Sequence, residues 1–164
     1  MGALLNNIVD ATTMATTHAD QHNSLSNAIV SAFSYNNGGG GGTTTSAAYT
    51  STLTGGTAAA VTFTVPSTGI IIVTITARLF NSGANWNLVS FALSGANTLA
   101  AADNNGLVWA PDTGVTVNAD KQASRVTYLS GLVAGSTTAT MNFKTTGGTL
   151  TEAINTILVQ TVGI

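Results

Sequence analysis

The chain has 164 residues, and its four basic and six acidic side chains make up only 6% of them, with a net charge of −2. Typical soluble proteins carry about 25% charged residues. So few Lys and Arg cannot bind a polyanion by releasing counterions, so we expect neither nucleic acid nor a membrane as a partner. Zero cysteines exclude disulfides and thiolate metal sites, and no apolar run approaches the roughly 20 residues of a membrane span.

The first predicted unit is an N-terminal arm, residues 1–35, with a short helix over about 17–34. Thr17 followed by Asp20 fits a variant of the capping box. Apolar or bulky residues then recur at intervals of four and three, which is typical of a heptad seam; they are His18, His22, Leu25, Ile29 and Ala32. Because so short a helix is marginal in water, the seam needs partner chains or another surface to pack against.

His18 and His22 raise the question of a metal site, because two histidines four residues apart occur in many zinc peptidases. In those enzymes the residue after the first His is the Glu that acts as general base, whereas this chain has Ala19 there. A catalytic zinc also needs a third protein ligand, and the sequence offers no other His and no Cys. We therefore expect no catalytic metal and no cofactor. The alternative is a structural ion held by both histidines on an axis between copies.

The second predicted unit is a hinge, residues 36–46, with the sequence NNGGGGGTTTS. Its five consecutive glycines give the backbone maximal freedom, as in flexible linkers. The third unit, residues 47–164, has the alternation of strands. Val61, Phe63 and Val65 point to one side of a predicted strand at 60–65.

The stretch 69–80 is apolar on both faces at its start and then alternates, as expected of a central strand. Further alternating runs are Asn87–Leu93, Gln122–Leu129, Ala139–Thr145 and Ile154–Val162, with weaker ones near Tyr49 and Leu107. Roughly six to eight short strands without helical pattern between them predict an all-β protein, an antiparallel sandwich of jelly-roll or immunoglobulin-like type.

The predicted loops contain the remaining candidates for a site. Asp103, Asp112 and Asp120 could supply oxygen ligands to calcium, but Asp is also common in turns for its own sake. Arg125 could form an ordinary ion pair with Asp120. No nucleophile elbow or phosphate-binding loop is present in the sequence, and we expect no enzymatic activity.

Two tryptophans, Trp86 and Trp109, lie in loop-like surroundings, NSGANWN and GLVWAPD. Exposed loop aromatics can stack on sugars or anchor a protein contact, so both residues are candidates for a receptor contact. The alternative is that they close the ends of the sandwich.

Two stretches resemble virion proteins of tailed bacteriophages. HADQHNSLSNAI (18–29) is similar to the helix near the start of phage tail and head appendage proteins. YLSGLVAGSTTATMNFKT (128–145) resembles a strand–turn–strand of phage jelly-roll domains and, more distantly, of trimeric C1q/TNF-like heads, with Gly135 in the turn. The resemblance implies a jelly-roll domain, homotrimers, a virion location and no enzymatic activity.

Three functions fit this resemblance. The preferred one is a capsid decoration or cement protein that binds the major capsid protein through its arm. The alternative is a receptor-binding protein of the tail tip or of a tail or head fibre, and a third is a non-viral adhesin, against which the lack of an export signal counts. From apolar periodicity, the expected anchors of the arm are Leu4, Leu5, Ile8, Leu25, Ile29 and Phe33.

Overall fold

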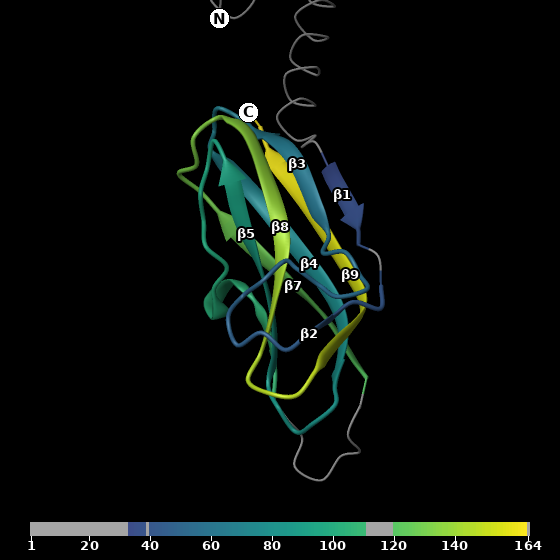
Figure 1. Cartoon of the computed structure of the whole chain (residues 1–164). Helices are drawn as coiled ribbons and strands as arrows, with labels where there is room; N and C mark the ends of the chain where they lie inside the picture. The colour runs from purple at the N-terminus through teal and green to yellow at the C-terminus, as the bar shows by residue number, and fades with distance from the viewer. Residues whose placement is uncertain (1–32, 39, 111–119, 164) are drawn as a thin grey trace, which may run out of the picture.

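A computed structural model of the chain describes residues 33–38, 40–110 and 120–163, and for residues 33–37 the backbone alone. These residues fold as two antiparallel sheets packed face to face (Figure 1). In the five-stranded sheet the order is β1–β9–β4–β7, with β2 also paired to β9. In the four-stranded sheet it is β3–β8–β5–β6. The predicted antiparallel jelly-roll-like β-sandwich is confirmed.

The strands of the five-stranded sheet are β1 (Phe33–Asn37), β2 (Thr43–Thr44), β4 (Ile70–Asn81), β7 (Lys121–Leu129) and β9 (Leu150–Val162). Those of the four-stranded sheet are β3 (Ala60–Val65), β5 (Asn87–Gly95), β6 (Leu107–Trp109) and β8 (Gly135–Thr145), and a short 3-10 helix, η1 (Asp103–Asn105), precedes β6. Each of the six strong runs in the sequence lies within a strand or overlaps one in all but its end residue. The weak run near Leu107 is β6, and near Tyr49 the backbone makes a single bridge between Thr50 and Phe143.

The core lies between the sheets and follows the period of two. On β4 the inward residues are fully buried; they are Ile71, Val73, Ile75, Ala77 and Leu79. Phe91, Met141 and Phe143 face them from β5 and β8 and are also buried. Burial of each large side chain contributes about 1.5 to 3 kcal/mol. β4 pairs with β9 on one side and β7 on the other, so it has the predicted central position.

A β-bulge in β9 breaks the alternation. Against β4, Arg78 pairs with Ile154 but Leu79 pairs with Glu152, so one extra residue, Ala153, lies on β9. The extra residue of such a bulge reverses the alternation, so residues after it point to the opposite face from that expected by counting. As a result both Glu152 and Asn155 are buried although they are three positions apart, an odd spacing that would place them on opposite faces of a regular strand.

The predicted hinge at 36–46 is wrong for the residues that the structure describes. The backbone at 33–37 and 43–44 is extended and pairs with β9, so the predicted helix also cannot extend to residues 33 and 34. Between these strands, the Gly41 N–H donates to the Glu152 carbonyl at 2.7 Å. A Cβ on Gly40 would collide with the backbone carbonyl of Ala153. The absence of side chains at these glycines therefore allows their backbone to pack closely against β9; it does not serve to make the segment flexible. The rest of the predicted arm, residues 1–32, lies outside the described residues.

Candidate functional site

Trp86 lies in the turn between β4 and β5, where 45% of its surface is exposed. The neighbouring turn between β8 and β9 holds its backbone: the Trp86 N–H donates to the Thr146 hydroxyl at 3.0 Å, and its carbonyl accepts from the Thr146 N–H at 3.1 Å. An exposed indole on a fixed backbone is suited to stacking or to anchoring a protein contact, because little ordering entropy is lost on binding.

A buried amide network supports this end of the sandwich. The side-chain NH2 of Asn81 donates to Asn87 Oδ1 at 2.7 Å and to the Thr145 hydroxyl at 3.0 Å, and its carbonyl oxygen accepts from the Gly83 N–H at 2.9 Å. These three side chains are buried. A buried network with its members satisfied keeps the local structure rigid. Sequence reasoning missed it, because Asn at strand ends is also typical of turns.

Trp109 ends β6 opposite Asn87, so the structure brings both tryptophans to the same end of the molecule. Unlike Trp86, Trp109 is half-buried and packs against the hydrophobic core. This packing favours the alternative that the sequence left open, in which the ring closes the end of the sandwich, and a receptor contact at Trp109 stays a prediction. The function of Trp86 as a receptor contact stays a prediction.

The most unusual ionisable group is Glu152, whose side chain is completely buried on β9. Among the described residues, neither of its carboxylate oxygens has a hydrogen-bond partner. Burial raises the pKa of Glu152 to about 7, although the nearby Asn155 side chain and Gly42 N–H lower it. Glu152 therefore changes charge near neutral pH, beside the glycine segment that pairs with β9. Sequence reasoning did not single out Glu152.

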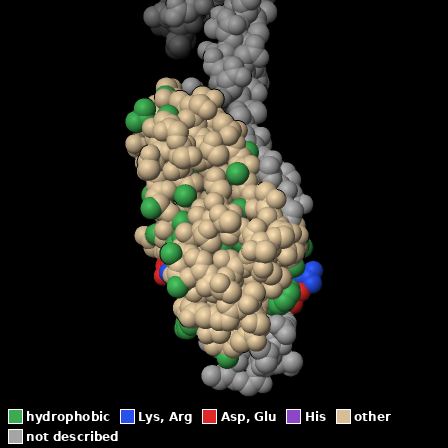
Figure 2. All heavy atoms as spheres, in the orientation of Figure 1, with side chains coloured by type: hydrophobic (Ala, Val, Ile, Leu, Met, Phe, Trp, Pro, Cys, Tyr) green, Lys and Arg blue, Asp and Glu red, His purple; other side chains and the backbone are tan. Residues whose placement is uncertain are grey.

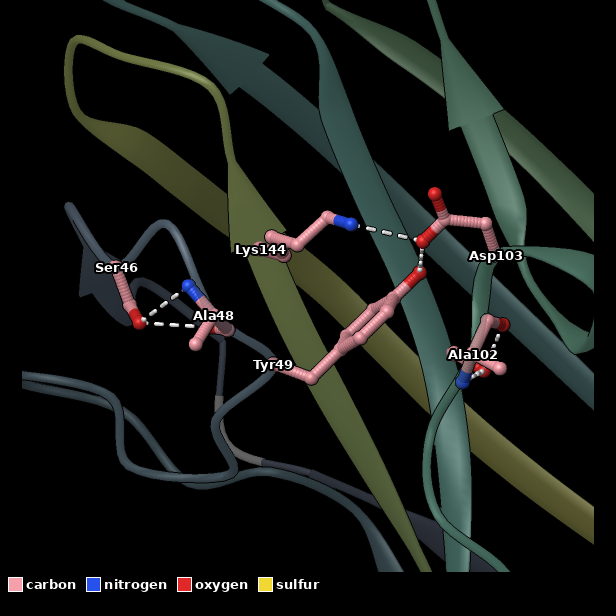
Figure 3. A network of polar contacts seen from close by, with 7 residues as sticks. Ser46, Ala48, Tyr49, Ala102, Asp103 and Lys144 are labelled. Atoms are coloured by element: carbon pink, nitrogen blue, oxygen red, sulfur yellow. Dashed lines mark hydrogen bonds and ion pairs between the residues drawn. The ribbon is translucent and has the colours of Figure 1, made fainter.

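An exposed polar cluster joins three segments on the outer side of the four-stranded sheet (Figure 3). Asp103 Oδ1 accepts hydrogen bonds from the Tyr49 hydroxyl at 2.9 Å and from Lys144 Nζ at 2.8 Å, and Lys144 Nζ lies 4.8 Å from the centre of the Tyr49 ring. The hydrogen bonds from Lys144 and then Tyr49 lower the pKa of Asp103. Burial and the bond to Asp103 raise the pKa of Tyr49. The cluster holds the chain near residue 49 and η1 against β8.

The predicted pair of Arg125 and Asp120 is wrong. Asp120 forms an ion pair with Arg78, and Arg125 instead donates to the Asn104 carbonyl at 2.6 Å. Arg78 lies on the neighbouring strand at the end where β7 begins, so it reaches Asp120 more directly. Among the described residues, no three His, Cys, Asp or Glu gather as a metal site would require. Asp103 and Asp120 each pair with a cation, and Asp112 lies outside the described residues.

The other predicted site residues fall outside the described part of the chain. They are His18, His22, Leu4, Leu5, Ile8, Leu25 and Ile29. The backbone of Phe33 begins β1 opposite Gln160. In the described part of the chain, no helix is both long and apolar enough to cross a membrane. Figure 2 shows one face of the molecule, on which hydrophobic side chains are scattered and charged ones lie at the flanks.

The fold is shared with known structures, whereas no protein family and no curated protein matches the sequence. A TNF of S. frugiperda, Eiger, is 12% identical, with a TM-score of 0.50 over 80% of this chain and 93% of the TNF chain. A protein of the T13 IBDV viral particle is 10% identical, with a TM-score of 0.52 over 82% of this chain and 32% of the viral one. This chain thus spans about a third of the viral protein. At these identities the similarity establishes the fold alone.

Proposed function

We propose that the chain is a non-enzymatic structural protein of a bacteriophage virion, namely a homotrimeric decoration or cement protein of the capsid surface. It binds the major capsid protein through its N-terminal arm, residues 1–32. The observation that carries the proposal is the pairing of β1 with β9, which fixes the point at which the arm leaves the jelly roll. A likeness in fold to a protein of an icosahedral viral particle supports the virion location.

The pairing of β1 with β9 places the start of β1, which residues 1–32 precede. Phe33 lies beside Gln160, which pairs with Ile72 near the start of β4, while Trp86 follows the other end of β4. The start of β1 and the exposed tryptophan therefore lie at opposite ends of the sandwich, with β1 beginning at the upper end in Figure 1. In a trimer the three arms are linked through one body. Once one arm is bound to the capsid, the other two are held close to their own sites at a high effective concentration, so attachment is tighter than for a single arm. Because apolar anchors carry little charge, attachment depends weakly on salt.

The test is the position and copy number of the protein on purified particles, by cryo-EM and quantitative gels, for the natural chain and for the double variant Leu25→Asp/Ile29→Asp. A matched control is Val108→Asp, at an exposed position of β6, which lies in the other sheet from β1. We expect many copies over the capsid, retained by the control and lost by the double variant. Full attachment of the double variant would overturn the role of the arm.

A second function, binding of a host receptor from a tail tip or fibre, is favoured by Trp86 alone. Its exposed ring lies on a turn held by backbone hydrogen bonds, at the end of the sandwich opposite to the start of β1. This function predicts a handful of copies at the tail tip or a vertex, and loss of host binding in Trp86→Ala. With that outcome, the decoration role would be wrong.

A further inference from the structure

Glu152 is a buried carboxylic acid that lies against a segment of chain with almost no side chains. Its own side chain is 0% exposed, and neither carboxylate oxygen has a hydrogen-bond partner among the described residues. The Gly41 N–H donates to the Glu152 carbonyl at 2.7 Å, and the Glu152 N–H donates to the Gly42 carbonyl at 2.8 Å. Immediately after these glycines, β2 pairs with residues 150 and 151. We call residues 40–44 the cover segment.

The two neighbours of Glu152 in the sheet differ in how firmly they are held. On one side lies Leu79, a buried core residue of β4, the strand that is paired along both edges. On the other side lies the cover segment, at the free edge of β9 (Figure 1), joined to the next turn by two bonds of 2.9 Å between Thr43 and Thr54. Segments held mainly by backbone bonds, with few apolar contacts, open at a lower free energy than core strands. The cover segment is therefore the part that can move to let water reach Glu152.

Burial, and not a charged partner, controls the ionisation of Glu152. Burial raises the pKa of Glu152 to about 7, against the opposing effects of the Asn155 side chain and the Gly42 N–H. In the described part of the chain, the cover segment, residues 50–57, β3 and the rest of β9 contain no charged residue. The charged groups of the other surrounding strands are Arg78 on β4, paired with Asp120, Lys121 on β7, one strand beyond Leu79 in the same row, and Lys144 on β8, bound to Asp103 on the outer side of the other sheet.

We infer that Glu152 is a pH-sensitive latch, whose neutral carboxyl keeps the cover segment packed on β9 and whose ionisation releases that segment. A buried carboxylate without a partner is strongly disfavoured, because it has lost its hydration. Opening of the cover segment restores the hydration and leaves the core strands in place. β1 precedes the cover segment and pairs with the same edge of β9, so release also loosens the strand that follows residues 1–32. Only the meaning of this last step for capsid binding rests on the proposed function.

The direction of the pH effect follows from proton linkage. The pKa of Glu152 is about 7 in the closed state, against an ordinary value of 4.5 when water surrounds the carboxyl. Below pH 4.5 the group is neutral in both states, so opening is unaffected. Between the two values only the open state gives up its proton, and the equilibrium constant for opening rises about tenfold per pH unit. Above pH 7 the effect levels off, after a total increase on the order of a hundredfold.

The first experiment measures hydrogen exchange of the full chain by NMR between pH 5 and 8, with each rate corrected for the intrinsic rate at that pH. The reporter is the Gly41 amide, which bonds to β9. The matched control is the Leu99 amide, which bonds to the Leu93 carbonyl of the other sheet at 3.1 Å. We expect protection at Gly41 to fall on the order of a hundredfold in the natural chain and to stay constant in Glu152→Gln. At Leu99 it should stay constant in both proteins.

Three results of this experiment would overturn the inference. Protection at Gly41 that is the same at every pH would show that nothing is released. An equal fall at Gly41 and Leu99 would show that ionisation destabilises the whole sandwich instead of one segment. A fall at Gly41 that persists in Glu152→Gln would assign the pH effect to another group.

The second experiment needs no substitution and so does not depend on how a variant folds. Because Glu152 is the chain's single glutamate, labelling with glutamate that carries 13C at Cδ gives one carboxyl signal. We expect this signal to titrate with a midpoint near pH 7 in the natural chain. A midpoint near 4.5 would place the carboxylate in water and overturn the inference. Neither experiment uses a particle, so either can fail while attachment through residues 1–32 still holds.

Discussion

The backbone N–H of Gly38 donates to the Asn155 carbonyl at 2.9 Å, and the Asn155 side chain fills the space that a Cβ on Gly38 would need. The same side chain accepts a hydrogen bond from the Ala59 N–H and donates to the Thr57 carbonyl at 3.2 Å. Asn155 thus joins β9 to two separate segments. The glycine run is one of the two, so the link between arm and sheet is a packed part of the fold.

Gly38→Ala tests this packing, because a packed segment and a flexible hinge predict opposite changes in the free energy of unfolding. At a flexible hinge, Ala would be neutral or would stabilise by about 0.4 to 1 kcal/mol, because it restricts the unfolded chain. Here the added methyl collides with Asn155 and with the backbone of Thr57. We expect a loss of about 1 to 3 kcal/mol in the free energy of unfolding, as for other overpacked sites, measured by urea denaturation. The control is Gly83→Ala, whose methyl meets the flexible Asn85 side chain.

Glu152→Gln should alter how stability depends on pH. The pKa of Glu152 is raised to about 7 in the folded chain from an ordinary value of 4.5. Between these values the folded state binds more protons than the unfolded state, so stability falls as pH rises from about 4.5 to 7. The neutral amide should abolish this loss, which amounts to about 1 to 3 kcal/mol above pH 7.

Urea midpoints of both proteins between pH 4 and 8 provide the measurement. The variant should match the natural chain near pH 4 and exceed it at pH 8. Glu152 is the chain's single glutamate, and His18 and His22 are common to both proteins, so the difference isolates this carboxyl. If the urea midpoints of the two proteins differed by the same amount at every pH, Glu152 would not be buried as described.

The two tryptophans should respond differently to substitution. Trp109→Ala removes a half-buried ring that packs against the core, and we expect it to cost about 2 to 4 kcal/mol, toward the range for buried aromatics. Trp86→Ala removes an exposed ring and should cost less than about 1 kcal/mol. Thermal unfolding measures both. Quenching of the remaining tryptophan by acrylamide should be stronger in Trp109→Ala, which retains the exposed Trp86. Equal quenching would contradict the assigned burial.

Asn81→Ala should destabilise the end of the sandwich that presents Trp86. It removes the donor to the buried Asn87 carbonyl oxygen, while the Thr145 hydroxyl keeps its bond to the Gly147 carbonyl. Each buried polar group left unpaired costs about 1 to 3 kcal/mol. Asn142→Ala is the matched control, because in the described structure the Asn142 side chain makes only a local hydrogen bond, to the Thr140 carbonyl. Hydrogen exchange should also show faster opening at 82–87 in Asn81→Ala, and a loss no larger than the control's would argue against the network.

Period-two alternation was sufficient to predict the strands whose inward residues, such as Ile71, Val73 and Ile75, form the core, but it did not predict β1 and β2. It could not reveal the bulge at Ala153, which brings Glu152 and Asn155 to the same side and depends on the partner strand β4. The glycine run was misread for a related reason. Composition reports the freedom that Gly permits, but the collision at Gly40 is visible only once β9 is placed beside it.

The outward residues of β7 show the same limit. Val126 and Tyr128 fit an alternating strand equally well whichever of its sides faces the core, so the sequence alone predicted β7 but not that these two residues are exposed. Trp86 and Trp109 likewise looked alike in sequence. The pairing of Trp109 with Asn87, and its packing against the core, separate them.

Because β1 and β2 pair with β9, the first and last strands of the described structure are neighbours. During synthesis on the ribosome, β1 and β2 therefore have no strand to join until nearly the whole chain has emerged. Pairing of segments so distant in sequence is slow and comes late in folding. β1 and β2 thus join the sheet only after β9 has been made, so each newly made chain forms most of its sandwich before the strand that follows residues 1–32 is in place.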